Sequence, residues 1–144
     1  MALEEIRVLV VDDSAVVRAI IADSIVAAPD MKVVGAAGDG RQALEILDAV
    51  RPDVITLDIQ MPTLDGLATL DAILKRRPIP VIMVSSLTKL GASITLDALN
   101  RGAVDYLAKP DYGPKTKAAI REDLPRKIRS AAGTDVRRIL QIRQ

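Results

Sequence analysis

Carboxylates follow two short apolar runs of the 144-residue chain, each at the point where the run ends. Asp12 and Asp13 come directly after the run from Ile6 to Val11, and Asp58 comes directly after the run from Val54 to Leu57. If these runs are parallel strands of an open sheet, their carboxyl ends meet at the edge where such sheets build their sites. Three carboxylates brought together repel one another unless a cation shares them. Oxygen-only ligands favour Mg²⁺, Ca²⁺ or Mn²⁺, and Mg²⁺ suits a shallow loop site because it takes few protein carboxylates.

A hydroxyl and a lysine follow two later apolar runs, Ser85 after residues 79–84 and Lys109 after residues 104–108. A lysine offsets the negative charge of a phosphoryl group, and a hydroxyl donates a hydrogen bond to a phosphate oxygen. An aspartate that faces metal-bound phosphate can act as a nucleophile and form an aspartyl-phosphate. We therefore interpret Asp58, Ser85 and Lys109 as a candidate phosphoryl-transfer site.

Apolar runs alternate with segments of helical periodicity five times, which predicts an α/β fold with one parallel sheet. We expect five strands in the flavodoxin-like order 2-1-3-4-5, with helices on both faces of the sheet. The predicted strands are residues 6–11, 33–37, 54–57, 79–84 and 104–108. The predicted helices lie between Ser14 and Pro29, between Gly40 and Pro52, from Leu64 to Arg77, from Ser93 to Arg101 and from Lys115 to Ala132. Pro125 is expected to kink or divide the last helix.

The composition excludes several classes of function. The chain has no histidine, so it cannot build a Ser-His-Asp triad, a histidine general base, a histidine zinc ligand or a phosphohistidine carrier. It has no cysteine, so it holds no disulfide and no thiolate metal site. No stretch approaches the roughly 18 apolar residues of a membrane span, and no signal-peptide pattern begins the chain. We expect a cytoplasmic protein without a membrane partner.

The net charge of +1 conceals an asymmetry between two parts of the chain. Residues 1–114 carry 11 basic and 16 acidic side chains, whereas residues 115–144 carry 9 basic and 3 acidic ones. A basic tail can mark a contact with nucleic acid. We favour a solvated helix face followed by a linker, because residues 133–144 are too few for a DNA-binding helix-turn-helix.

Each candidate site residue has a plainer interpretation when it is taken alone. Asp12 could belong to an ordinary helix N-terminus, Asp58 to a loop, Ser85 to a strand end and Lys109 to the surface. Their order along the chain and their common position at strand ends favour one shared site. The glycines of residues 35–40 have the spacing G-x-x-G-x-G, which is not that of a dinucleotide-binding loop.

The motifs at these strand ends resemble, in order, those of response-regulator receiver domains. They read Val-Asp-Asp-Ser, Leu-Asp-Ile-Gln-Met-Pro, Asp-Gly, Val-Ser-Ser and Lys-Pro. The resemblance covers about residues 6–132 and implies the CheY-like form of the predicted fold. It implies that residues 1–132 form a receiver domain and that residues 133–144 are a linker or the start of a further domain.

The resemblance also implies roles for the acidic residues. Asp58 would be the phospho-acceptor, and Mg²⁺ would be bound directly by Asp13 and by the main-chain carbonyl of Gln60. Asp12 would bind the ion largely through water. Gln60 departs from the acidic residue that is common at its position in the subfamily named below, and this departure bears on the rate of dephosphorylation.

Three further roles follow from the same resemblance. Ser85 would be the switch hydroxyl and Lys109 the phosphate-binding lysine. Tyr106 would be an aromatic rotamer switch, although a plain half-buried tyrosine fits its position as well. The bond between Lys109 and Pro110 would be cis, as is common in this family.

The longer match Pro-Val-Ile-Met-Val-Ser-Ser-Leu-Thr is similar to the receiver of chemotaxis protein-glutamate methylesterases. This similarity implies a sensor histidine kinase of chemotaxis type as phosphodonor and an esterase domain in cis, so that this chain is regulatory and not itself the esterase. It further implies a partner face formed by the fourth helix, fifth strand and fifth helix, which could also form a phosphorylation-dependent dimer. The alternatives are a stand-alone or DNA-binding response regulator, or a phosphatase or phosphotransferase for small molecules, for which the short loops offer no lid.

Overall fold

The computed structural model describes residues 5–59, 65–86, 89–109 and 114–143. Five parallel strands form one sheet in the order β2-β1-β3-β4-β5, which confirms the predicted architecture. The strands are β1 Ile6–Val11, β2 Met31–Ala37, β3 Val54–Asp58, β4 Val81–Ser86 and β5 Asp105–Lys109. The helices are α1 Ala15–Val26, α2 Gly40–Val50, α3 Gly66–Arg76, α4 Lys89–Arg101, α5 Pro114–Ala132 and α6 Val136–Arg143.

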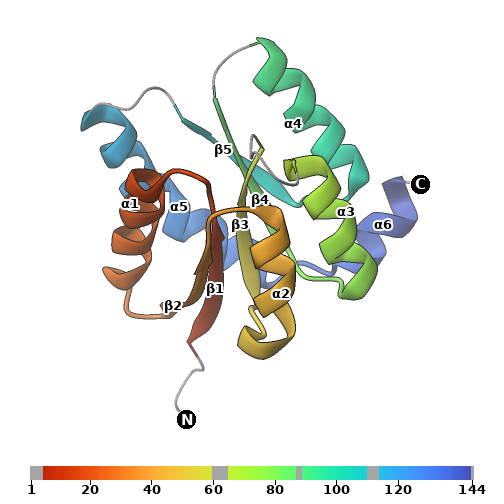
Figure 1. The fold of residues 1–144 in the computed structure, drawn as a ribbon, viewed down its shortest axis with the longest axis horizontal. Coiled ribbons are helices and arrows are strands. Elements are labelled where there is room, and N and C mark those ends of the chain that lie inside the picture. The colour runs from red at the N-terminus through yellow and green to blue at the C-terminus, as the bar shows by residue number, and fades with distance from the viewer. Residues whose placement is uncertain (1–4, 60–64, 87–88, 110–113, 144) are drawn as a thin grey trace.

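Helices cover the sheet on both faces, with α1 and α5 on one side and α2, α3 and α4 on the other (Figure 1). Successive side chains of a strand point to opposite faces, so the central strands are buried on both sides and are almost wholly apolar. In β1, Val8 and Val10 join the core beneath α1 and α5, while Leu9 and Val11 join the other core. Thr56 in β3 is an exception, because its buried hydroxyl oxygen has no hydrogen-bond partner within the described part of the chain.

Three of the helices begin at a polar cap that follows a strand or a loop. Ser14, Asp39 and Asp65 each have extended backbone, and each accepts a hydrogen bond through its side chain from a main-chain N–H of the helix that follows. Such caps satisfy N–H groups that have no partner inside the helix. The caps therefore fix where α1 and α3 start, and both helices start next to the carboxyl ends of strands.

Two helices differ from their predictions, one in its start and one in its continuity. The first is α4, which begins at Lys89 and not at Ser93. Its first turns contain Gly91 and Thr95, which are buried but are not apolar enough to show helical periodicity in the sequence. The second is α5, which runs through Pro125 without the predicted division. The buried side chains of Leu124 and Ile128 hold the helix to the sheet beside the proline.

The fourth strand is also displaced from its prediction, since it pairs from Val81 to Ser86 and not from Ile79 to Val84. Pro80 explains the late start, because a proline has no N–H to give to a strand ladder. Its carbonyl still accepts a hydrogen bond from the N–H of Ile55 at 3.0 Å. The displacement extends the strand toward the carboxyl edge, so Ser85 lies inside the paired region.

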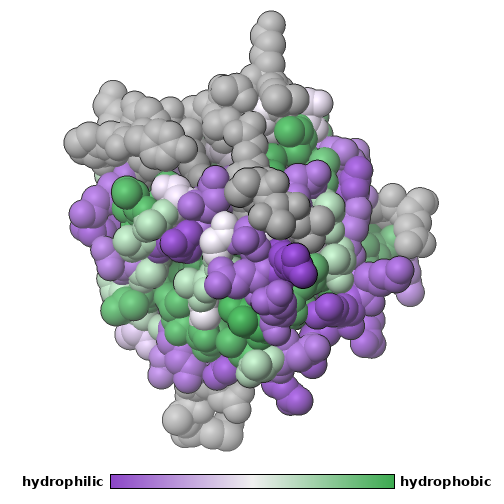
Figure 2. Space-filling model, viewed as in Figure 1, coloured by the Kyte–Doolittle hydropathy of each residue, from purple (hydrophilic) through white to green (hydrophobic). Residues whose placement is uncertain are grey.

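The last described helix, α6, packs beside the C-terminal end of α4 (Figure 1). Val136 at its start is buried, and Leu140 lies against Gly102, the residue that follows α4. None of the helices in the described ranges is long and apolar enough to cross a membrane. On the face drawn in Figure 2, hydrophilic residues surround the apolar ones that gather in the lower half of the view.

Candidate functional site

Three carboxylates meet at the carboxyl edge of the sheet. One oxygen from each of Asp12, Asp13 and Asp58 lies within 4.8 Å of the other two. Asp12 and Asp58 are buried, and Asp13 is exposed. Two like charges about 4 Å apart near a protein surface repel each other by roughly 4 kcal/mol. A shared hard cation would relieve this repulsion, and a set of oxygen ligands that is open to water on one side fits Mg²⁺.

Asp12 accepts two hydrogen bonds, one through its side chain and one through its main chain. The N–H of Ser14 donates to one carboxylate oxygen of Asp12 at 2.9 Å, and the Ser14 hydroxyl in turn caps α1 by accepting from the N–H of Val17 at 3.2 Å. The guanidinium of Arg18 donates to the main-chain carbonyl of Asp12 at 2.6 Å. The helix-cap interpretation of Ser14 and the site interpretation of Asp12 are therefore both compatible with the same turn. Arg18, which lies one helical turn beyond Ser14, was not predicted from the sequence.

Asp58 is the last residue of β3, and the chain after it returns to touch it at Gly66. Ile59 donates to the carbonyl of Val84 at 3.2 Å and accepts from the N–H of Gly66 at 3.0 Å. A Cβ atom on Gly66 would lie 2.6 Å from the carbonyl oxygens of both Asp58 and Ile59. Real Cβ atoms essentially never approach other atoms so closely. Gly66 is thus required for α3 to start directly against the strand end that carries Asp58.

Ser85 lies next to this strand end, because its neighbour Val84 pairs with Asp58 across β3 and β4. The Ser85 side chain is 5% exposed and faces α4, where its hydroxyl oxygen is 3.0 Å from that of Thr95. Thr95 was not predicted from the sequence. Its signal is a hydroxyl on the buried side of α4, at helical spacing from Gly91 and Ala98.

The remaining candidate residues are only partly described by the structure. Lys109 ends β5 opposite Ser86, and its side chain lies outside the described part of the structure. Gln60 and Pro110 lie outside the described residues, so the carbonyl ligand and the cis bond stay predictions. Tyr106 is 46% exposed, and the ammonium of Lys127 is 5.5 Å from the centre of its ring.

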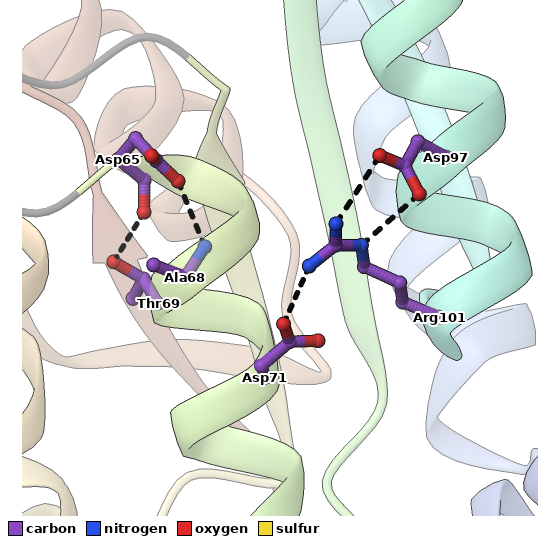
Figure 3. A network of polar contacts seen from close by, with 6 residues as sticks. All are labelled: Asp65, Ala68, Thr69, Asp71, Asp97 and Arg101. Carbon is purple, nitrogen blue, oxygen red and sulfur yellow. Dashed lines mark hydrogen bonds and ion pairs between the residues drawn. The ribbon is translucent and has the colours of Figure 1, made fainter.

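A charged contact joins the two helices that flank the edge of the site. Arg101 of α4 donates to Asp97 on its own helix at 3.0 Å and reaches across to Asp71 of α3 at 2.5 Å (Figure 3). The hydrogen bond to Asp97 and the charge of Asp71 raise the pKa of Arg101. In the same view, Asp65 caps α3 by accepting from the N–H of Ala68 at 2.8 Å. Because these side chains are exposed, the contact contributes little to the stability of the fold.

The model of the response regulator receiver domain matches residues 8–121 of this chain. The chain belongs to the response-regulator receiver family. The resemblance that was inferred from the motifs at the strand ends is thereby confirmed. The matched range includes the strand ends that carry Asp12, Asp58, Ser85 and Lys109. Its limits lie inside residues 1–132, the range predicted for the receiver domain.

Curated relatives point to one subfamily of receivers. The chain is 51% identical over 136 residues to the protein-glutamate methylesterase/protein-glutamine glutaminase of Thermotoga maritima, covering 94% of this chain and 40% of that protein. It is 47% identical over 135 residues to protein-glutamate methylesterase/protein-glutamine glutaminase 1 of Dechloromonas aromatica, covering 93% of this chain and 39% of that protein. The chain therefore spans about two fifths of the length of these relatives.

Solved structures agree with this assignment. The response regulator domain of Thermotoga maritima CheB superposes with a TM-score of 0.83 at 51% identity, covering 92% of this chain and 99% of that one. A chain of the complex between the P1 domain of CheA3 and CheY6 from R. sphaeroides has a TM-score of 0.73 at 34% identity, covering 91% and 99%. A chain of the CheX-CheY-BeF3-Mg²⁺ complex from Borrelia burgdorferi has a TM-score of 0.74 at 27% identity, covering 88% and 89%.

Proposed function

We propose that this receiver domain accepts a phosphoryl group on Asp58 in the presence of Mg²⁺ and passes the change on to a partner surface. The observation that carries the proposal is the meeting of Asp12, Asp13 and Asp58 within 4.8 Å at the carboxyl edge of the sheet. Ser85 on the adjacent strand end supplies the hydroxyl that such a site needs for a phosphoryl oxygen.

Each residue has one task in the proposed transfer. The donor is a phosphorylated histidine of the partner kinase. A carboxylate oxygen of Asp58 bonds to phosphorus while the bond between phosphorus and the histidine nitrogen breaks, and the electron pair of the broken bond returns to the imidazole. Asp13 and the carbonyl of Gln60 would hold Mg²⁺ directly and Asp12 largely through water; the bound ion neutralises charge on the phosphoryl oxygens. Lys109 compensates the added negative charge. Ser85 donates its proton to a phosphoryl oxygen.

The proposed phosphodonor is a sensor histidine kinase of chemotaxis type. The complex of CheA3 P1 with CheY6 supports this donor, and the complex that contains BeF3 and Mg²⁺ supports the cation. The relatives' names support a regulatory role in a protein-glutamate methylesterase, with residues 1–132 as the receiver and residues 133–144 as the connection to an esterase domain. Tyr106 on β5 would take part in changing the partner surface near α4 and α5.

Intact-protein mass spectrometry after incubation with acetyl phosphate tests the proposal. One phosphate adduct of about 80 Da should form only when Mg²⁺ is present, and Asp58→Asn should remove it, because a carboxamide is not an adequate nucleophile. Asp71→Asn is the matched control, since it changes an exposed carboxylate on α3 outside the acidic cluster. Asp13→Asn should keep the adduct but require more Mg²⁺. An adduct that persists in Asp58→Asn would show that the acceptor is wrong.

A further inference from the structure

Two buried hydroxyls connect the end of β4 to the first turns of α4. The hydroxyl oxygen of Thr95 lies 3.0 Å from that of Ser85 and 2.7 Å from the carbonyl oxygen of Gly91. Both threonine and serine side chains are 5% exposed, so water competes little for these hydrogen bonds. The short chain Ser85–Thr95–Gly91 therefore joins the strand end beside Asp58 to the helix that covers it.

The number of protons fixes the direction of these bonds. A hydroxyl carries one proton, and a carbonyl can only accept. When both bonds exist, the proton of Thr95 goes to Gly91, and the proton of Ser85 goes to Thr95. Ser85 then has no proton left for a phosphoryl oxygen. If Ser85 turns its proton to a phosphoryl group on Asp58, Thr95 must either lose its bond from Ser85 or release Gly91 to donate to Ser85.

We propose that Thr95 is a positioning residue that holds Ser85 in the unphosphorylated arrangement and transmits its release to α4. The inference rests on the proposed function, because it concerns the regulation of the same site. Whichever bond Thr95 gives up, a hydrogen bond that α4 makes in the resting protein is lost when Ser85 turns. The phosphoryl group on Asp58 thus competes with α4 for a single proton.

The buried side of α4 carries this change toward α6. Thr95, Ala98 and Gly102 are all buried at helical spacing, and Gly102 directly follows the last residue of the helix. A Cβ on Gly102 would lie 2.6 Å from a terminal methyl carbon of Leu140. The side chain of Leu140, in α6, therefore packs directly against the residue that follows α4. A shift of α4 therefore reaches α6, through which the chain continues beyond the matched receiver region.

Binding of beryllium fluoride with Mg²⁺, a stable analogue of the phosphoryl group, tests the role of Thr95. Thr95→Val keeps the shape of the side chain and removes the resting hydrogen bond, so it should tighten binding about five-fold, the value of one ordinary hydrogen bond. Thr95→Ser keeps a hydroxyl and should stay within about two-fold of the wild type. In a Ser85→Ala background, Thr95→Val should have no effect on the affinity, because the proton in question is gone.

Backbone amide shifts of α4 and of Leu140 give a second readout in the same titration. In the wild type both should move on addition of beryllium fluoride with Mg²⁺, and in Thr95→Val the movement should be smaller, because the resting bond is already absent. Equal affinity and equal shifts in wild type and Thr95→Val would overturn the inference and leave the proposed function intact. Failure of the wild type to bind beryllium fluoride at any Mg²⁺ concentration would instead overturn the proposed function and the inference with it.

Discussion

Replacing Gly66 by alanine should weaken both the fold and the phosphorylation of Asp58, because the new methyl group has no room. Its Cβ would lie 2.6 Å from two main-chain oxygens, whereas ordinary contacts begin at 3.4 Å. The chain must therefore separate by about 0.8 Å at this point, the difference between those two distances. The atoms in contact are backbone, so a side-chain rotation cannot relieve the overlap.

The expected free energy follows from two opposing terms. Overpacking that forces backbone shifts costs about 1–3 kcal/mol. Alanine recovers at most about 1 kcal/mol of this through its higher helix propensity. We therefore expect Gly66→Ala to lower the free energy of unfolding by about 1–2 kcal/mol. A misplacement of about 1 Å at a reacting centre can slow a reaction about 100-fold, so phosphorylation of Asp58 should slow by roughly 10- to 100-fold.

Urea unfolding and the rate of phosphate incorporation measured by intact-protein mass spectrometry check the two effects. Gly133→Ala is the control, because its Cβ would meet nothing closer than the carbonyl of Ser130 at 3.9 Å. This control should change stability by less than about 0.5 kcal/mol and leave the rate unchanged. If Gly66→Ala is destabilised but is phosphorylated at the wild-type rate, the displacement goes into α3, and the link between Gly66 and Asp58 is refuted.

Three further changes have defined expectations. Thr56→Val should raise the free energy of unfolding by about 1 kcal/mol, because a buried hydroxyl without a partner costs about 1–3 kcal/mol. A lower stability of the variant in urea unfolding would mean that the hydroxyl makes a stabilising interaction. Gly102→Ala should lower the free energy of unfolding by about 1–3 kcal/mol, since the φ of 123° at Gly102 is strained for any residue with a Cβ. Adding Leu140→Ala to this variant should not restore the lost stability, and full recovery would assign the loss to the contact with Leu140 alone. The hydrogen bond from Arg129 lowers the pKa of Asp30, so this pair stabilises the fold above the ordinary carboxyl pKa and loses its effect as the pH falls through the lowered value. Unfolding at a series of pH values should show Asp30→Asn less stable than the wild type at pH 7 and equal to it in acid; a pH-independent difference would contradict the ion-pair explanation.

The order of the strands could be predicted because both faces of the central strands are buried. Burial on two faces produces apolar runs such as the one from Val54 to Leu57, and parallel connections leave few topologies for five of them. The boundaries were harder where local chemistry opposed the pattern. Pro80 shortens the start of β4, and Pro125 is tolerated inside α5 because buried neighbours outweigh one lost hydrogen bond.

The acidic part of the site could be predicted from position alone, because a carboxylate directly after a buried strand must lie at the sheet edge. Gly66 and Thr95 could not be identified in this way. The need for glycine at position 66 comes from a backbone contact with residues 58 and 59, and sequence spacing does not reveal the closeness of two backbones. Thr95 lies ten residues from Ser85, and only the packing of α4 on β4 brings their hydroxyls together.

Thr95 is a polar residue on the buried side of α4. A buried hydroxyl costs free energy unless it is paired, and valine would fill the same space without that cost. Valine would, however, remove a hydrogen bond from the buried hydroxyl of Ser85 in the resting protein, so the threonine stabilises that arrangement and gives up a bond when Ser85 turns. The stability of the unphosphorylated protein and its readiness to respond to a phosphoryl group are therefore set against each other at this one hydrogen bond. A variant that strengthens the hydrogen bond should be harder to activate, and one that removes it should be easier to activate.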